Sequence, residues 1–183
     1  MNEKRKGATA RLCRLALLSA LALALSALEG IFTPILPPGV RAGLSNVVTM
    51  YAAASLGLPS ALTVTLLKAL FALLTRGVIA FGMSALGGLL SATLLYILFR
   101  FAKGKLGTVG ISVLGAAAHN LAQGLFALLI FGRAMLAYLP ILVLLSAPCG
   151  LVTGSLLYLV RYRRTQINSS PKGEHTYDRK NSL

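Results

Sequence analysis

The stretch Gly107–Phe131, GTVGISVLGAAAHNLAQGLFALLIF, decides the fold class of this chain. It is apolar and long enough to cross a bilayer, because about 20 residues at a helical rise of about 1.5 Å cover a hydrocarbon core of about 30 Å. Its middle nevertheless holds His119, Asn120 and Gln123. Polar side chains at that depth are costly unless they pair within the protein or face a wet cavity. We therefore predict a membrane-spanning helix with a functional site near its centre.

The spacing of these three polar residues predicts how they are arranged. His119 and Gln123 are four residues apart and share one face of a helix, with Asn120 on the adjacent flank. All three are candidate ligand-binding residues. The alternative is that they only hydrogen-bond neighbouring helices together, which polar side chains in membranes commonly do.

Composition indicates the same fold class for the whole chain. Of its 183 residues, 56% are hydrophobic and 12% charged, and the mean hydropathy is +0.78. The apolar runs are helix-length and polarity does not alternate from residue to residue, which favours a helical bundle over an outer-membrane barrel. We predict an all-α integral membrane protein built as a six-helix transmembrane bundle.

The net charge of +14 raises the possibility of nucleic-acid binding. The basic residues, however, lie at the chain ends and in short loops between apolar runs, where they act as topology signals. Three regions are expected: a basic cytoplasmic N-terminus at 1–11, a membrane domain at 12–162 and a polar, disordered cytoplasmic tail at 163–183. Six spans place both basic ends on the cytoplasmic face of the membrane, whereas five would put one of them outside.

The breaks between apolar runs define the expected helices. The segment Phe32–Gly43 contains three prolines and is expected to form an outer loop. Asn46 or Ser45 is expected to cap the helix that follows. The second and third helices are short, so they form either two tilted spans or a re-entrant pair. The expected helices are 10–31, 47–58, 60–75, 78–101, 107–131 and 135–162.

The first helix offers a surface for another helix. Ala16, Ala20 and Ala24 repeat every fourth residue and give one face that a partner can approach closely. A cleaved signal peptide is the alternative for this segment, but the rest of the chain also spans the membrane, which favours an uncleaved helix. Small residues within Ser84–Ser91 are expected to let neighbouring helices pack tightly in the same way.

Four further polar residues complete the candidate ligand site: Glu29, Asn46, Thr49 and Lys68. Glu29 is the only acidic residue near a span, and the alternative is that it sits in interfacial water. Lys68 lies in the third helix, where it either extends its flexible stem to the headgroups or faces the interior as a ligand or ion partner. Neutral hydrogen-bonding groups dominate the whole set, which suits recognition of a small polar molecule better than bond cleavage.

The sequence lacks the residues of several catalytic classes. It has one Asp, Asp178, and therefore cannot build the aspartate cluster that holds magnesium on an allylic diphosphate. Its glycine-rich stretches lack the Lys-Ser/Thr of a phosphate-binding loop. With His119 and His175 as the only histidines, two histidines cannot hold a haem within the bundle. Cys13 and Cys149 have no metal-ligand spacing and are interpreted as small buried residues. We predict a non-enzyme with no metal and no cofactor.

Three segments carry a family resemblance: GLSNVVTMYAAASLG (Gly43–Gly57), SALGGLLS (Ser84–Ser91) and GAAAHNLAQ (Gly115–Gln123). They resemble the Gx transporter family, which is also named heptaprenyl diphosphate synthase component I. The resemblance covers about residues 12–160. The family is similar to the substrate-binding S components of energy-coupling-factor transporters, which capture a small molecule from outside.

The resemblance implies two kinds of partner. An S component pairs with a transmembrane coupling subunit and two ATPases, and an alanine-rich face of its first helix meets the coupling subunit. The other family name implies a non-catalytic partner of a prenyl diphosphate synthase in menaquinone side-chain synthesis. A third hypothesis is a membrane partner in quinone- or flavin-linked electron transfer without a cofactor of its own.

Overall fold

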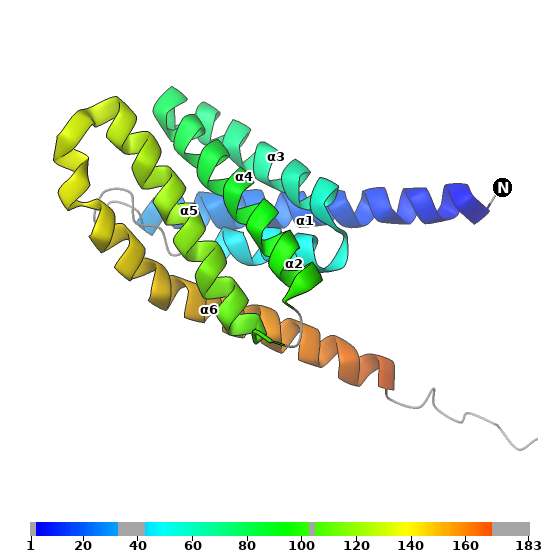
Figure 1. Cartoon of the computed structure of the whole chain (residues 1–183). Helices are drawn as coiled ribbons and strands as arrows, with labels where there is room; N and C mark the ends of the chain where they lie inside the picture. Colours follow the sequence, from blue (N-terminus) through cyan, green and yellow to red (C-terminus); the bar gives the residue numbers. More distant parts are fainter. Residues whose placement is uncertain (1–2, 33–42, 103–104, 170–183) are drawn as a thin grey trace, which may run out of the picture.

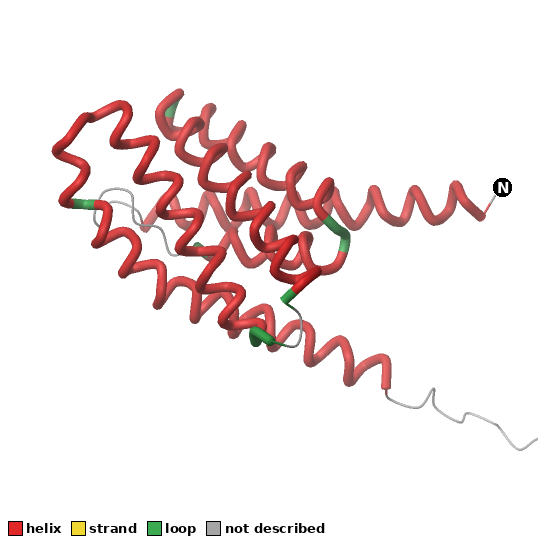
Figure 2. The backbone as a smooth tube through the Cα atoms, in the orientation of Figure 1, coloured by secondary structure: helices red, strands yellow, loops and turns green. Residues whose placement is uncertain are grey.

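The computed structural model describes residues 3–32, 43–102 and 105–169, and the regular elements in these ranges are helices (Figure 2). The predicted all-α membrane bundle is therefore confirmed. In chain order the elements are α1 (Glu3–Phe32), α2 (Leu44–Ser55), α3 (Leu58–Arg76), α4 (Val78–Phe101), α5 (Thr108–Phe131), the 3-10 helix η2 (Gly132–Ala137) and α6 (Leu139–Ser169). Most of the proline-containing loop expected at 32–43 lies outside the described residues.

Five of these helices are long and apolar enough to cross a membrane: α1, α3, α4, α5 and α6. The exception is α2, whose 12 residues rise about 18 Å, less than the hydrocarbon core of about 30 Å. Gly57, with φ of 92°, separates α2 from α3, and Pro59 lies in the first turn of α3. The second helix predicted from the sequence thus exists, but it is too short to span the membrane by itself.

Successive helices run in alternating directions, so the start of α1 and the end of α6 project from the same end of the bundle (Figure 1). The junction between α4 and α5 lies at that end too. Most basic residues with described side chains belong to it: Arg11, Arg14, Arg100, Lys105, Arg161 and Arg163. Arg76 and Arg133 close the helices at the opposite end. The charge asymmetry expected from the sequence is therefore present in the fold.

The start of α2 corrects one prediction. The helix begins at Leu44, after Gly43 with φ of 75°, a left-handed conformation that glycine adopts without strain. Neither Ser45 nor Asn46 caps it, because both lie in its first turn. Their polar groups instead bind Glu29 and Lys68 from neighbouring helices. The capping prediction is wrong because it considered only the local chain.

Glycines let the longer helices approach closely, as the small residues of α4 predicted. A Cβ on Gly87 would stand 2.7 Å from Gln123 Cγ on α5, and one on Gly88 would stand 2.4 Å from Thr65 Cγ2 on α3. On α6, a Cβ on Gly150 would stand 2.5 Å from the α-carbon of Val113 on α5. Real Cβ contacts are not this short, so these seams require glycine.

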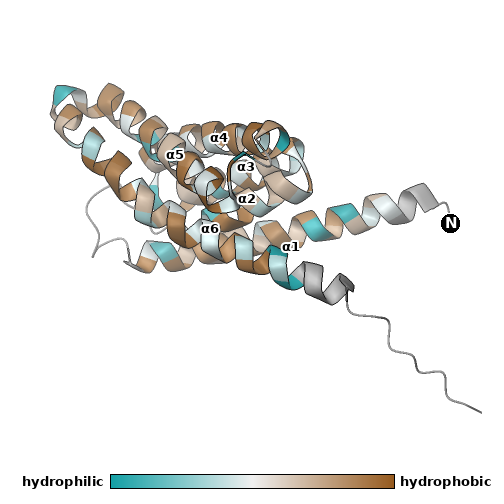
Figure 3. Ribbon diagram, turned by 60° about the horizontal axis from the view of Figure 1, so that its bottom comes forward, coloured by the Kyte–Doolittle hydropathy of each residue, from teal (hydrophilic) through white to brown (hydrophobic). Residues whose placement is uncertain are grey.

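The short helix α2 lies inside the bundle, in contact with α1, α3, α4 and α6. Its Val48, Met50 and Ala52 are buried. By contrast, many large apolar side chains of the long helices are exposed, including Leu17, Leu74 and Leu129. Hydrophobic residues predominate along these helices (Figure 3). An apolar exterior is what a lipid environment requires.

Candidate functional site

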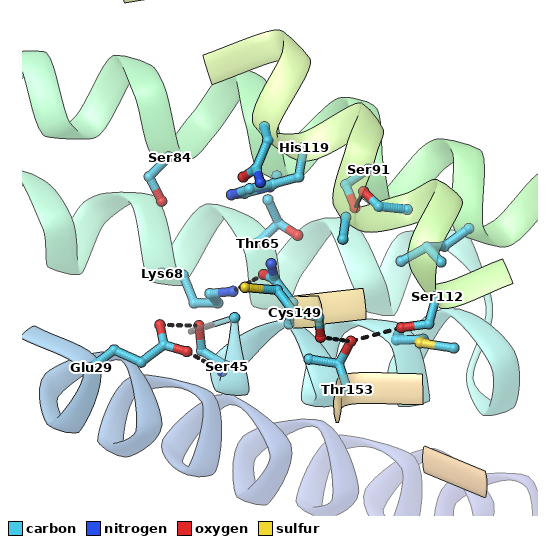
Figure 4. A pocket seen from close by; sticks show the side chains of 18 residues that line it. Glu29, Ser45, Thr65, Lys68, Ser84, Ser91, Ser112, His119, Cys149 and Thr153 are labelled. Carbon is cyan, nitrogen blue, oxygen red and sulfur yellow. Dashed lines mark hydrogen bonds between the residues drawn. The ribbon is translucent and has the colours of Figure 1, made fainter. Parts of the chain in front are cut away.

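A cavity lies at the centre of the bundle, and all six α-helices contribute to its lining (Figure 4). Its free volume is about 30 Å³, more than the roughly 10–15 Å³ that holds one water molecule. Most lining residues are polar or small. They are Glu29, Gly43, Ser45, Asn46, Met50, Thr65, Lys68, Ser84, Gly88, Ser91, Leu95, Ser112, Gly115, Ala116, His119, Asn120, Cys149 and Thr153.

Glu29 joins α1 to the start of α2. Its side chain is only 3% exposed, so the interfacial-water alternative does not hold. The backbone N–H of Ser45 donates to one carboxylate oxygen at 2.9 Å, and the Ser45 hydroxyl donates to the other at 3.1 Å. Because the first N–H groups of a helix have no partner within it and carry partial positive charge, a carboxylate there is well placed. Glu29 thus caps α2 from another helix.

Lys68 brings the opposite charge into the same cavity. Its side chain is 7% exposed and therefore faces the interior instead of reaching the headgroups. The ammonium donates to Asn46 Oδ1 at 2.8 Å and interacts electrostatically with Glu29. A buried charge in a membrane needs compensation by an opposite charge and by hydrogen bonds. Lys68, Asn46, Ser45 and Glu29 form a charged cluster that ties α1, α2 and α3 together.

On the other side of the cavity, hydroxyl groups tie α4, α5 and α6. Ser91 donates to the carbonyl of Gly115 at 2.9 Å. Ser112 and Thr153 share a hydrogen bond of 2.7 Å between their hydroxyl oxygens, and Thr153 Oγ1 also lies within bonding distance of the Cys149 carbonyl. These contacts are neutral, so this half of the cavity carries no charge of its own.

Two buried polar atoms in the lining have no hydrogen-bond partner in the structure: His119 Nδ1 and Thr65 Oγ1. His119 is 8% exposed and Thr65 is 2% exposed, so neither atom has bulk water as a substitute. Figure 4 shows both side chains beside the same space as Lys68. A buried polar group without a partner costs about 1–3 kcal/mol. These atoms therefore point to a missing partner within the cavity.

The remaining predicted site residues are placed differently. Asn120 lines the cavity, but its amide donates to the carbonyl of Leu142 on α6 at 3.0 Å and so also holds two helices together. Gln123 is buried against Gly87 and does not belong to the lining. Thr49 is buried on α2 and also lies outside the lining. The cavity brings together Glu29, Asn46, Lys68, His119 and Asn120 out of the seven predicted ligand residues.

Several lining residues were not predicted as ligand residues: Thr65, Ser112, Cys149 and Thr153, together with the α4 serines expected only to pack helices. The sequence offers one signal that could have identified Thr65. It lies three residues before Lys68 and therefore shares a helix face with it. Cys149 is half-buried at the cavity, whereas Cys13 is exposed on α1. The expectation that Cys13 is buried is wrong, because that side of α1 faces outward.

The predicted partner face of α1 is exposed. Ala16, Ala20 and Ala24 all point away from the bundle, while Ser19, Ala22 and Ser26 form the buried stripe of the same helix. Within the described residues, α1 contacts only α2 and α3 through several residues. None of the other helices in the described part of the chain covers the alanine face.

The described residues contain no group of three His, Cys, Asp or Glu side chains that could hold a metal ion. The fold and the cavity define a helical membrane protein with a small site between its helices, lined by polar and small residues. The family model described as heptaprenyl diphosphate synthase component I matches residues 18–160. This is well over half of the chain, which therefore belongs to the heptaprenyl diphosphate synthase component I family. No curated protein and no solved structure matches the chain significantly.

Proposed function

We propose that this chain is a membrane-embedded substrate-binding subunit of a small-molecule transporter, similar to an S component and energised by partner subunits. The observation that carries the proposal is the internal cavity, with contributions from six helices, two opposite buried charges and two buried polar atoms without a partner.

The size of the cavity defines what binding would require. A volume of about 30 Å³ accepts a group of a few atoms, whereas pockets for drug-sized ligands measure roughly 300–1,000 Å³. A larger substrate would bind only after neighbouring helices separate. The short α2, held at its start by Glu29, provides three side chains to the lining and spans less of the membrane than any other α-helix.

The outer surface supports a partner in the membrane. The exposed Ala16, Ala20 and Ala24 face lets another helix approach the α1 backbone closely. By resemblance, that helix belongs to a transmembrane coupling subunit associated with ATPases. The basic end of the bundle supports an orientation with both termini in the cytoplasm of a bacterium, and membrane domain boundaries at about 12 and 162.

Ligand identification tests this proposal. The full-length protein, extracted from its native membrane and purified, is expected to release a stoichiometric small molecule detected by mass spectrometry. His119→Ala should lose that molecule, because the substitution removes a cavity-lining group whose Nδ1 has no partner in the structure, along with a hydrogen bond between the ring and the Gly87 backbone. Thr93→Val is the control, since Thr93 bonds its own helix at Leu89 on an exposed face. Equal ligand content in His119→Ala and Thr93→Val would contradict the assigned site.

The family description favours a second candidate, a non-catalytic component I of heptaprenyl diphosphate synthase. It predicts that an aspartate-rich prenyl diphosphate synthase purifies with this chain and changes rate or product length when the chain is removed. Ala20→Leu separates the two candidates by a second measurement. The measurement is which proteins copurify with the chain. Under the transporter proposal, Ala20→Leu reduces the amount of copurified coupling subunit and does not change the amount of any copurified synthase.

A further inference from the structure

The hydrogen-bonding capacity left unused in the cavity indicates the chemistry of its ligand. Both oxygens of Glu29 already accept bonds from Ser45, and the Asn120 amide donates to Leu142. Lys68 is different, because an ammonium has three N–H donors and the structure gives this one a single acceptor, Asn46 Oδ1. The Thr65 hydroxyl has no partner in the structure.

These two donors are neighbours on α3. Thr65 and Lys68 are three residues apart, which places them on one helix face, and both line the cavity. Gly88 leaves room for the Thr65 methyl group, which lies 2.4 Å from where a Cβ on that glycine would stand. A buried ammonium and a buried hydroxyl together are satisfied by a group that offers two acceptor oxygens.

We propose that the cavity binds the carboxylate of a small organic acid, with Lys68 Nζ and Thr65 Oγ1 donating to its two oxygens. This inference rests on the proposed binding function and names the substrate class. His119 Nδ1 then faces a second polar group of the ligand, while Met50, Leu95 and Ala116 supply apolar wall.

Size and charge favour a carboxylate over a phosphate. A carboxylate is planar, has three heavy atoms and suits a volume of about 30 Å³ better than a tetrahedral group of five heavy atoms. Lys68 and Glu29 give the cavity a net charge near zero, so a monoanion leaves one excess negative charge. A phosphate with a second pKa near 6 would leave about two, beside the Glu29 carboxylate.

Saturation-transfer NMR on the detergent-solubilised full-length chain tests the assignment, with acetate and acetamide as probes. The two molecules have the same size and differ in charge. We expect saturable transfer to acetate and at least tenfold weaker binding of acetamide. Saturable binding of both with equal affinity, or no saturable binding of acetate, would overturn the proposal.

Variants locate the binding site. Lys68→Met alone leaves Glu29 without its countercharge, so the double variant Glu29→Gln/Lys68→Met is used, with monodispersity and helical content confirming its fold. We expect at least tenfold loss of acetate affinity in the double variant and in Thr65→Val a smaller, severalfold loss. Lys105→Met, which removes an exposed lysine outside the cavity, is the matched control and should bind acetate normally. Unchanged acetate affinity in the double variant would refute the role of Lys68.

These experiments can refute the carboxylate assignment without refuting the proposed binding function, and the reverse. A copurified neutral molecule that His119→Ala loses would leave the binding function standing and overturn the acid assignment. Acetate binding that depends on Lys68 would support the acid assignment whether or not a coupling subunit is found.

Discussion

The two halves of the cavity are stabilised in different ways. On the α1–α2–α3 side, buried charges form the main contacts, and Glu29 and Lys68 organise the backbone start of α2 and the Asn46 side chain. On the α4–α5–α6 side, helices approach through glycines and exchange neutral hydroxyl-to-carbonyl bonds. The charged half depends on a few strong interactions, whereas the neutral half distributes its stability over close packing.

This difference predicts where a single substitution is most damaging. Glu29→Ala removes the acceptor of two Ser45 bonds and the countercharge of Lys68. Glu29 and Lys68 interact electrostatically, and removing one of two opposite buried charges leaves the other without compensation, a loss of about 3–5 kcal/mol for a direct pair. We expect a loss of this size in the free energy of unfolding, measured by SDS titration in mixed micelles.

A double-variant cycle isolates the charge effect. Glu29→Ala combined with Lys68→Met should cost less than the sum of the two single changes, because no lone charge is left behind. Strict additivity of the two losses would show that the charges do not stabilise each other.

On the α4–α5–α6 side, added side-chain volume should reduce stability more than a change in charge. Gly150→Ala places a methyl group 2.5 Å from the Val113 α-carbon, and backbone atoms cannot move aside as a side-chain tip can. Overpacking of this kind costs about 1–3 kcal/mol. Gly110→Ala is the matched control on α5, because its methyl group would stand an ordinary 3.8 Å from Leu106. The same SDS titration should show a loss in Gly150→Ala only, and equal stability of both variants would contradict the close seam.

Substitutions of the neighbours His119 and Asn120 distinguish ligand binding from helix–helix contact on the α4–α5–α6 side of the cavity. Asn120→Ala removes the bond to Leu142 and should cost about 0.6–1.7 kcal/mol, the range for polar contacts between membrane helices. His119→Ala removes a hydrogen bond to the Gly87 backbone and a ring nitrogen without a partner, so it should cost no more stability than Asn120→Ala, while losing more bound ligand. Stability and ligand content measured on the same preparations test this, and a larger stability loss in His119→Ala would reverse the assignment.

Much of this arrangement could be predicted from the sequence, for identifiable reasons. Charges are rare in apolar segments, so Glu29 and Lys68 stood out, and a repeat every fourth residue identified the exposed alanine face of α1. Helical spacing correctly placed His119 and Gln123 on one side of α5. It could not show that Gly87 on α4 opens a slot that Gln123 fills. Likewise, Asn46 and Ser45 have the chemistry of caps, but a lysine and a glutamate distant in sequence take their polar groups.

The smallest expected effects are those of substituting two threonines whose hydroxyls have no partner in the structure. One of them lines the cavity and the other does not. Thr49 is buried outside the lining and Thr65 within it. Thr→Val keeps the shape and removes a hydroxyl that has no bond in the structure, so neither change should cost more than about 1 kcal/mol of stability. Only Thr65→Val should weaken acetate binding, because only its hydroxyl reaches the cavity. Equal binding loss in Thr49→Val would mean that the site extends around α2 to the face that carries Thr49, and the boundary between packed helix and ligand cavity would have to be redrawn there.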